Sequence, residues 1–358
     1  MQKRCAVGVP AGRAGCCAGR AARAATHRVL LTDLGPGVNP QAINNAGQVT
    51  GQAAGQAFLW SAGVLTPLGT LGGAESFGND LNDSGVVVGW SYDADGVQKG
   101  FKWQAGVMTN LDSVTALGSS AEAINVYDEI VGWKTNSSVY RSAWWLNANI
   151  AVGGQLMFGL GNHKALGIND QGKIVGVALD ASNDLDEGFY WNGADPITGP
   201  SGGLGLDYFP LAGVNNQDLT TGMFGDLAAS MAIGDSSPTS AGTVASNDLF
   251  SIALGLNDAG LIVGESDGKG FLFDRPTGTM HDLNQFARGG FAVDTIVRLT
   301  DINNQAAFVG VATVGGVEHA IYGQFVPVPE PATCLLALGG LAVLLAAHAG
   351  GILRRGLS

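Results

Sequence analysis

Clusters of acidic residues recur along this chain where the surrounding residues predict hairpin turns. The clusters are YDADG with Asp93 and Asp95, LDASNDLDEG with Asp184, Asp186 and Glu187, and GESDG with Asp267. Closely spaced carboxylates offer the oxygen ligands that Ca²⁺ prefers, and they accept hydrogen bonds from sugar hydroxyl groups. No cluster has the full spacing of a calcium loop, and solvated hairpins are the plainer interpretation. The pattern therefore predicts a candidate ligand face with no named metal ligand and no cofactor.

The GESDG segment, Gly264 to Gly268, also matches the G-x-S-x-G motif that carries a nucleophilic serine in α/β-hydrolases. That motif requires a turn from a strand into a helix. Here it ends a predicted strand of a hairpin, and Ser266 aligns with Ser91 of an earlier repeat that lacks the motif. The sequence therefore predicts a protein that is not an enzyme and has no catalytic residue.

The acidic residues are concentrated in one long stretch. Residues 27–326 hold 29 Asp and Glu against 11 Lys and Arg, which gives a net charge of −18. Nucleic-acid binding needs Lys and Arg to neutralise phosphates, so this composition argues against that partner. It suits contact with cations or neutral sugars. All four cysteines lie outside this stretch, so neither disulfides nor cysteine metal ligands are expected to hold it together.

The acidic clusters belong to a repeated unit. The phrase INNAGQVTG at Ile43 returns six times, and successive copies start 38 to 46 residues apart. The later copies are LNDSGVVVG at Leu81, INVYDEIVG at Ile124, INDQGKIVG at Ile168, VNNQDLTTG at Val214, LNDAGLIVG at Leu256 and INNQAAFVG at Ile302. A steady period of this length is typical of propeller blades.

One period contains four predicted strands. In the second copy, a first strand runs into Leu81, a turn covers Asn82 to Gly85, and a β-branched strand covers Val86 to Trp90. The segments GFKW and VMTNL supply the third and fourth strands. The sequence therefore predicts an all-β protein, a seven-bladed β-propeller over residues 27–326 with four-stranded antiparallel blades. The fifth copy lacks the turn glycine and an aromatic third strand, so its blade is the least regular.

Aromatic residues recur once per unit near the end of the third strand. They are Trp60, Trp103, Trp145, Trp191, Phe273 and Tyr322. Their regular recurrence predicts packing between neighbouring blades, with a ligand-facing ring as the alternative. Trp90 and Trp133 each follow the glycine of a second strand, and they are the better candidates for exposed aromatics.

The two ends of the repeat region complement each other. The seventh copy has three predicted strands and then continues into VPVPEPAT without a fourth. The segment VLLTDLG at Val29 is similar to the fourth strands VLTPLG at Val64 and TMHDLN at Thr279. We therefore expect the N-terminal strand to complete the last blade, a closure that removes the open edge of the array.

The combination LGTLGG, INxxGxVVG and AFLW resembles the HAF-type extracellular repeat. It is clearest across Leu68 to Trp103 and Gly255 to Phe273, and the resemblance covers nearly all of Val29 to Phe325. That family is bacterial and exported and has no established enzymatic activity. The resemblance therefore implies a surface or secreted interaction protein.

The C-terminal segment, 327–358, resembles the PEP-CTERM sorting signal. Its motif is Val328, Pro329, Glu330 and Pro331, followed by an apolar run over 332–353 and by Arg354 and Arg355. As a helix, 22 residues span about 33 Å, enough to cross a bilayer, and the arginines favour the cytoplasmic side. The resemblance implies an exosortase as partner in a Gram-negative bacterium that makes exopolysaccharide. It also implies transient residence in the inner membrane before transfer to the cell surface or extracellular biofilm matrix, whereas an ordinary C-terminal anchor is the alternative.

Residues 1–26 form a basic N-terminal segment rich in Ala and Gly, whose short apolar stretch is interrupted by arginines. We interpret it as the remnant of a signal region or as the product of a misassigned start. The sequence as a whole predicts a non-enzymatic exported protein that binds exopolysaccharide or a surface glycan. The alternative is a structural scaffold for protein contacts at the cell surface, and a glycan array would separate the two.

Overall fold

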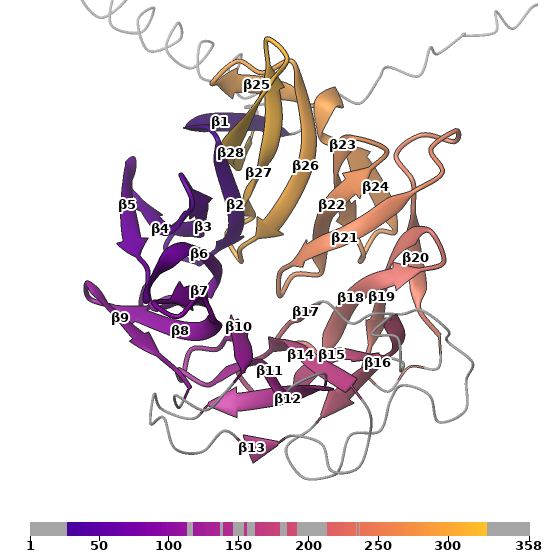
Figure 1. The fold of residues 1–358 in the computed structure, drawn as a ribbon. Coiled ribbons are helices and arrows are strands. Elements are labelled where there is room, and N and C mark those ends of the chain that lie inside the picture. Colours follow the sequence, from indigo (N-terminus) through magenta and orange to yellow (C-terminus); the bar gives the residue numbers. More distant parts are fainter. Residues whose placement is uncertain are drawn as a thin grey trace, which may run out of the picture. The chain divides into compact units, whose positions relative to one another are not determined.

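The computed structural model describes residues 27–112, 117–136, 139–145, 154–155, 162–179, 185–191, 213–233, 235 and 237–327. The N-terminal segment 1–26, the sorting motif and the transmembrane helix expected over 332–353 lie outside these residues. Val29–Val326 forms one compact unit, to which the following description applies. In this unit the chain forms seven antiparallel sheets that succeed one another around a central axis (Figure 1).

The sheets are the blades of a seven-bladed β-propeller, and blades 1 to 6 each begin with their innermost strand. Blade 1 consists of β2 (Val38–Ile43), β3 (Val49–Ala53), β4 (Gln56–Ser61) and β5 (Val64–Gly69). Blade 2 consists of β6 (Gly72–Leu81), β7 (Val87–Asp93), β8 (Gln98–Gln104) and β9 (Val107–Asn110). Blade 3 consists of β10 (Gly118–Ile124), β11 (Ile130–Asn136), β12 (Val139–Trp145) and β13 (Gly154–Gln155). In blade 4 the described strands are β14 (Asn162–Ile168), β15 (Ile174–Leu179) and β16 (Leu185–Trp191). Blade 5 consists of β17 (Gly213–Val214), β18 (Leu219–Phe224), β19 (Leu227–Ala232) and β20 (Thr239–Gly242). Blade 6 consists of β21 (Ser251–Leu256), β22 (Leu261–Ser266), β23 (Lys269–Asp274) and β24 (Thr279–Asp282).

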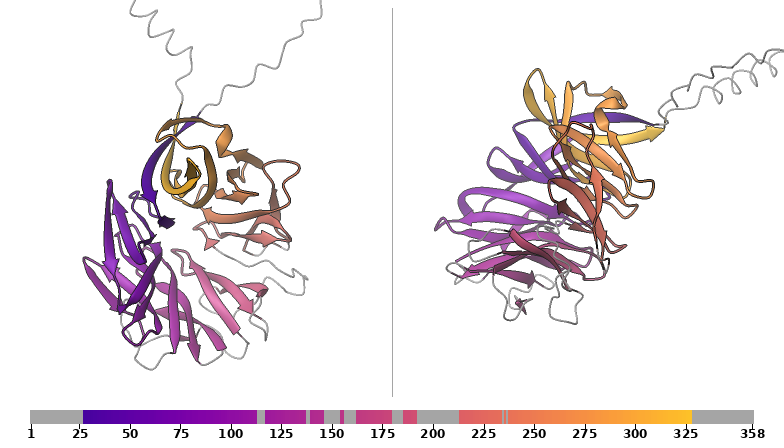
Figure 2. Two further views of the ribbon diagram at one scale, coloured as in Figure 1. Left: turned by 45° about the horizontal axis from the view of Figure 1, so that its top comes forward. Right: turned by 90° about the vertical axis from the view of Figure 1, so that its right-hand side faces the viewer.

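Blade 7 contains segments from both ends of the propeller. Its strands are β26 (Thr295–Ile302), β27 (Ala307–Val314), β28 (Val317–Pro327), β1 (His27–Pro36) and β25 (Ala287–Gly290), in the spatial order β25-β1-β28-β27-β26. A short 3-10 helix, Leu283–Gln285, precedes β25. The indigo strand β1 thus lies in the same sheet as the yellow strand β28 (Figure 2). Val29 and Leu31 of β1 are buried in a cluster with Phe308 and Ile321.

Seven apolar clusters fill the seams between successive blades, including the seam between blades 7 and 1. In that last seam Ile43, Phe58 and Trp60 pack against Ala307 and Val309. The core therefore consists of a ring of interfaces, because each blade is apolar on both faces. A single blade would therefore leave apolar faces uncovered, and burial of the core requires neighbouring blades.

Hydrogen bonds also cross the seams at a recurring position. The Oγ atoms of Ser76, Ser119 and Ser251 lie six residues before the turn asparagine of their repeats. Each accepts an N–H from the third strand of the preceding blade at 2.8 Å. In blade 4, His163 Nδ1 takes this role and accepts the N–H of Ser142 at 2.9 Å. Burial and the nearby Arg141 lower the pKa of His163 to about 4, so the ring stays neutral and its acceptor is preserved.

The fold confirms the packing role expected for the recurring aromatics. Trp60, Trp145 and Phe273 are buried, and Trp103, Trp191 and Tyr322 are half-buried against the clusters. Phenylalanines one or two positions earlier in the same strands are more deeply buried, as Phe58, Phe101, Phe189 and Phe271 show. The fifth blade, expected to be the least regular, is a four-stranded sheet, whereas three strands are described for the fourth.

Candidate binding site on the ring axis

The asparagines that open the seven repeated turns form a closed hydrogen-bonded ring around the axis. Each side-chain Nδ2 donates to the backbone carbonyl of the equivalent asparagine in the next blade, at 2.9 to 3.2 Å. The members are Asn44, Asn82, Asn125, Asn169, Asn215, Asn257 and Asn303, all of them buried. We call this set the asparagine ring. The last bond, from Asn303 to the carbonyl of Asn44, joins blade 7 to blade 1.

The same side chains also build the turns. In every copy the Oδ1 accepts the backbone N–H four residues later, at 2.8 to 3.2 Å. The fourth residue of each turn has a positive φ, between 56° and 77°, which glycine adopts without strain. Each asparagine therefore stabilises its own turn through Oδ1 and links two blades through Nδ2.

Two turns carry aspartate at the left-handed position, and each uses it for a contact between blades. Asp128 has a φ of 62° and forms an ion pair with Lys102 of blade 2 at 2.8 Å. Asp218 has a φ of 61° and forms an ion pair with Lys173 of blade 4. These contacts offset the cost of the left-handed backbone, and they explain why the third and fifth copies lack the turn glycine.

A β-bulge interrupts the inner strand shortly before the turn in six blades. The bulged residues, which the pairing register skips, are Gln41, Asn79, Glu122, Leu166, Leu254 and Thr300. The bulge pushes an inner carbonyl against the glycine that ends the repeated phrase. A Cβ on Gly264, for example, would lie 1.9 Å from the carbonyl oxygen of Ile252. The final glycine of the phrase is thus required by this close approach.

The bulged residues and the asparagine turns line a central cavity of about 320 Å³. Every charged residue on the described part of its wall is acidic, and no Lys or Arg lines it there. These residues are Asp80, Asp83, Glu122, Asp170, Asp258 and Asp301. A cavity of this size matches the low end of small-molecule sites.

Asp80 and Asp301 occupy equivalent positions on blades 2 and 7, on either side of blade 1. Each carboxylate accepts an N–H from the next blade, that of Ile124 for Asp80 and that of Ile43 for Asp301, at 2.9 Å. Each also accepts the N–H of its following residue, at 2.7 and 2.8 Å. Burial raises the pKa of both carboxyls to about 7, and the charge on Asp80 adds to the effect at Asp301.

A second acidic position on the wall belongs to a polar and aromatic cluster. Glu122 accepts a hydrogen bond from Trp133 Nε1 at 2.7 Å, and burial raises its pKa. Lys164 of blade 4 lies 4.9 Å from the ring centroid of Trp133 and 4.2 Å from that of Tyr140. Burial lowers the pKa of Lys164, while the charge of Glu122 opposes that shift. Trp133, a candidate for an exposed aromatic in the sequence, is half-buried within this cluster.

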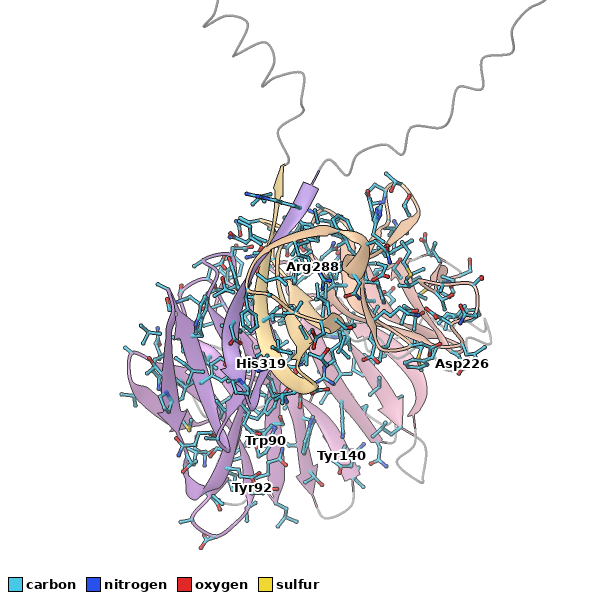
Figure 3. The ribbon with its side chains drawn as sticks, turned by 90° about the horizontal axis from the view of Figure 1, so that it is seen from above. Trp90, Tyr92, Tyr140, Asp226, Arg288 and His319 are labelled. Carbon is cyan, nitrogen blue, oxygen red and sulfur yellow. The ribbon has the colours of Figure 1, made fainter. Side chains whose placement is uncertain are left out.

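Trp90, the other expected exposed aromatic, is half-buried in blade 2. It stacks on Phe77, with centroids 6.2 Å apart and an interplanar angle of 6°, and meets Tyr92 edge-on at 5.5 Å. Figure 3 labels Trp90, Tyr92 and Tyr140. The two aromatic groups belong to consecutive blades.

The cavity wall is divided into two arcs. The bulged positions of blades 7, 1, 2 and 3 are polar, with Thr300, Gln41, Asn79 and Glu122. Those of blades 4 and 6 are Leu166 and Leu254, and glycines take the positions equivalent to Asp80 in blades 4, 5 and 6. At the level of the bulges, one side of the cavity therefore presents polar side chains and the other presents leucines and glycines, while Asp170 and Asp258 add carboxylates at the turns of blades 4 and 6.

A second set of polar groups follows the asparagine ring by one residue. Its members are Asn45, Asp83, Val126, Asp170, Asn216, Asp258 and Asn304. Backbone N–H groups of this set donate to the next member's side chain, for example Asn304 to Asn45 Oδ1 at 2.9 Å and Asn45 to Asp83 Oδ1 at 2.8 Å. Val126 interrupts the series in blade 3 and is 47% exposed.

The described members of the acidic clusters singled out in the sequence lie at the opposite end of the blades, because consecutive strands are antiparallel. Asp93 and Asp267 stabilise their own surroundings: Asp93 Oδ1 accepts the N–H of Val97 at 2.9 Å, and Asp267 Oδ2 that of Leu249 at 2.7 Å. Asp95 is exposed in the turn between β7 and β8. Asp186 and Glu187 lie in β16, and Asp184 lies outside the described residues.

Ser266 has a structural role. It is fully buried at the end of β22, and a two-residue turn leads directly into β23. Its Oγ donates to Asp248 at 3.0 Å and accepts the N–H of Val244 at 3.1 Å. Asp248 also pairs with Lys269 at 2.6 Å. The match to G-x-S-x-G therefore reflects packing between the fifth and sixth blades.

No protein-family model matches this chain, and a comparison with curated proteins found no match either. Among solved structures, it is similar to the extracellular domain of a one-component system from B. thetaiotaomicron, with 6% identity and a TM-score of 0.47 over 81% of this chain and 39% of that one. It is also similar to a puromycin-hydrolyzing peptidase of Mycobacterium tuberculosis, with 14% identity and a TM-score of 0.49 over 80% of this chain and 48% of that one. The chain thus spans less than half the length of these two proteins.

A TolB-type protein of Agrobacterium tumefaciens is similar over 84% of this chain and 99% of its own length, with 11% identity and a TM-score of 0.42. All three identities are below 15%. The fold assignment therefore rests on the seven sheets of this chain and on their order around the axis.

Proposed function

We propose that this chain is an exported, non-enzymatic binding protein that associates with exopolysaccharide at the cell surface or in the extracellular matrix. The observation that carries the proposal is the central cavity, whose wall combines carboxylates and amides with hydrocarbon and bears no Lys or Arg in its described part. Sugars offer hydroxyl donors on their edges and C–H groups on their faces, so they complement such a wall. The acidic body adds no affinity for phosphate-rich polymers.

Binding fits the acidic groups of the cavity better than catalysis does. Asp80 and Asp301 each accept backbone N–H groups from two blades, so their positions are fixed by the ring itself. Groups held in this way can orient a ligand by accepting its hydrogen bonds. Ser266 offers no nucleophile to solvent, because it is buried and bonded to Asp248.

Export and sorting belong to the same proposal and rest on the C-terminal segment. We infer that an exosortase-type enzyme recognises Val328, Pro329, Glu330 and Pro331, with Arg354 and Arg355 behind the apolar run. In the described part of the chain, no helix is both long and apolar enough to cross a membrane. Mass spectrometry of the exported protein tests the inference. We expect a C-terminus close to Pro331, whereas an intact Ser358 in the surface fraction would identify a permanent anchor.

A scaffold role is the second candidate, and one surface feature favours it. Val64 and Val107 follow equivalent turns of blades 1 and 2, and they are 65% and 63% exposed. Val126 and Tyr127, in a turn at the same end of blade 3, are 47% and 64% exposed. Exposed apolar residues that gather at one end of neighbouring blades suit contact with another protein.

A glycan array, combined with pull-down on the cell's own exopolysaccharide, separates the candidates. We expect the full-length protein to retain the polysaccharide, whereas a protein that binds no glycan would leave the scaffold role as the remaining candidate.

A second experiment tests whether the acidic turns at the opposite end bind the polysaccharide, directly or through Ca²⁺. In one arm Asp184, Asp186 and Glu187 are changed to Asn, Asn and Gln, and in the other a chelator is added. If the central cavity is the site, both treatments leave binding unchanged. Loss of binding in either would move the site to that face.

A further inference from the structure

Two half-buried carboxylates of the cavity wall, those of Asp80 and Asp301, have no cationic partner among the described residues. By contrast, Asp112 is paired with Lys134 and Asp128 with Lys102. Neither Asp80 nor Asp301 forms an ion pair within the described residues, and the groups that bond them are backbone N–H. A carboxylate away from bulk water is costly unless a positive charge compensates it. The cavity thus supplies negative charge that a ligand can neutralise.

The positions of Asp80 and Asp301 favour an ammonium group over a metal ion as the positively charged ligand. Asp80 and Asp301 flank blade 1, where the equivalent residue is Ala42, so the wall between them is formed by a small side chain. Within the described residues, no group of three or more His, Cys, Asp or Glu is arranged to hold a metal ion. An ammonium group needs only a few acceptors in loose geometry, whereas Ca²⁺ requires six to eight oxygen ligands.

The opposite arc limits the rest of the ligand. Leu166 and Leu254 face the axis from blades 4 and 6, and Leu254 is 38% exposed there. A ligand that spans the 320 Å³ cavity would therefore meet Asp80 and Asp301 on one side and two leucine side chains at the level of the bulges on the other. Hydroxyl groups along its length would meet Gln41, Asn79 and Thr300 on the polar arc.

We propose that the central cavity binds a hydroxylated primary amine, such as an amino-sugar unit of a polysaccharide, with its ammonium group on the arc that carries Asp80 and Asp301. This inference rests on the proposed function, because it specifies the sugar class that the same cavity takes. It predicts a preference for amine-bearing over neutral polyols of the same length. A free amine on the bound unit is required, since an acetylated nitrogen carries no charge.

A matched pair of probes tests the preference. Glucamine and sorbitol share one carbon chain and differ in one terminal group, an amine in the first and a hydroxyl in the second. Titration calorimetry on the full-length protein at pH 8 should show glucamine binding at least tenfold more tightly than sorbitol. At this pH Asp80 and Asp301, whose pKa values are about 7, are ionised. Calcium chloride serves as a third probe. If calcium displaces glucamine, the cavity is a metal site and the amine assignment is wrong.

Two sets of variants locate the site. Asp80→Asn together with Asp301→Asn should remove the preference for glucamine. Because that pair also bridges blades, Leu254→Trp provides an independent variant that fills the cavity and leaves the carboxylates in place. It should abolish glucamine binding, whereas Leu249→Trp, at a site 82% exposed outside the cavity wall, should preserve it.

The outcomes separate this inference from the function on which it rests. Equal affinity for sorbitol and glucamine, or glucamine binding that survives Leu254→Trp, would overturn the amine assignment. If the protein retains its own polysaccharide in that case, the binding function stands and only the sugar class is wrong. If neither probe nor polysaccharide binds, the proposed function fails as well.

Discussion

The side chain of Asn303 donates to the backbone carbonyl of Asn44, 259 residues earlier in the sequence, at 2.9 Å. This bond is the seventh of a series in which the other six join blades that are consecutive in sequence. The propeller is therefore closed at its axis by the same contact that joins every other pair of neighbouring blades. At its periphery, strand β1 joins β28 in one sheet, and Asp33 Oδ1 lies 3.1 Å from His319 Nδ1.

Removal of one amide from the asparagine ring should destabilise the whole propeller. Asn257→Ala would remove one bond between blades and leave buried N–H groups of its own turn without acceptors. We expect a loss of about 3 kcal/mol in the free energy of unfolding, measured by urea denaturation. Asn304→Ala, at the exposed neighbouring position, should cost less than about 1 kcal/mol, and equal losses for the two would contradict the role of the ring.

The glycine that ends the repeated phrase should not accept even a methyl group. In Gly264→Ala the new Cβ would lie 1.9 Å from the carbonyl oxygen of Ile252, and the β-bulge that causes this contact could not relax without moving the inner strand. We expect a destabilisation of about 3 kcal/mol or more. Gly213→Ala serves as the control, because its Cβ would approach nothing closer than 3.4 Å. A stable Gly264→Ala variant would show that the bulge is adaptable.

The N-terminal strand should contribute to stability through its buried side chains. Leu31 is 3% exposed in the cluster that contains Phe308 and Ile321, so Leu31→Ala should cost about 2 to 4 kcal/mol. Deletion of Val29 to Leu34 should lower the melting temperature further and promote aggregation, since it uncovers the edge of β28. An unchanged melting temperature after the deletion would refute closure by this strand.

The two cavity carboxylates should make the protein more stable in mild acid. Their pKa is about 7 in the folded state and near 3.8 when unfolded, so between these values the folded state binds more protons. Stability then falls as the pH rises from 4 to 7, by about 2 kcal/mol or more per carboxyl. Denaturation at pH 5 and pH 8 measures the difference, which Asp80→Asn with Asp301→Asn should reduce. If both forms respond equally, other groups cause the dependence.

The repeat period and the strand pattern predict much of this fold. The turn phrase, its spacing and the short aromatic strands correctly indicate seven blades, because each signal is local and is repeated. The link that each asparagine makes between blades was not predicted. Its side chain reaches the next blade, and such a contact between units has no signature within one unit.

The cavity could not be read from the sequence for a related reason. A regular strand alternates its side chains between two faces, but the β-bulge shifts this alternation by one residue. Asp80, Glu122 and Asp301 are placed on the cavity wall as a result. The one available signal was the glycine at the end of each phrase, whose lack of a side chain marks the close approach of the bulged strand.

The central claim is that the axial cavity binds the polysaccharide. Saturation binding of fluorescently labelled exopolysaccharide to the full-length protein tests it directly, with Leu254→Trp compared with Leu249→Trp. We predict that the cavity-filling variant loses at least tenfold in affinity, while the variant outside the cavity binds as the unchanged protein does. Equal affinity for all three proteins, with all of them folded, would contradict the claim.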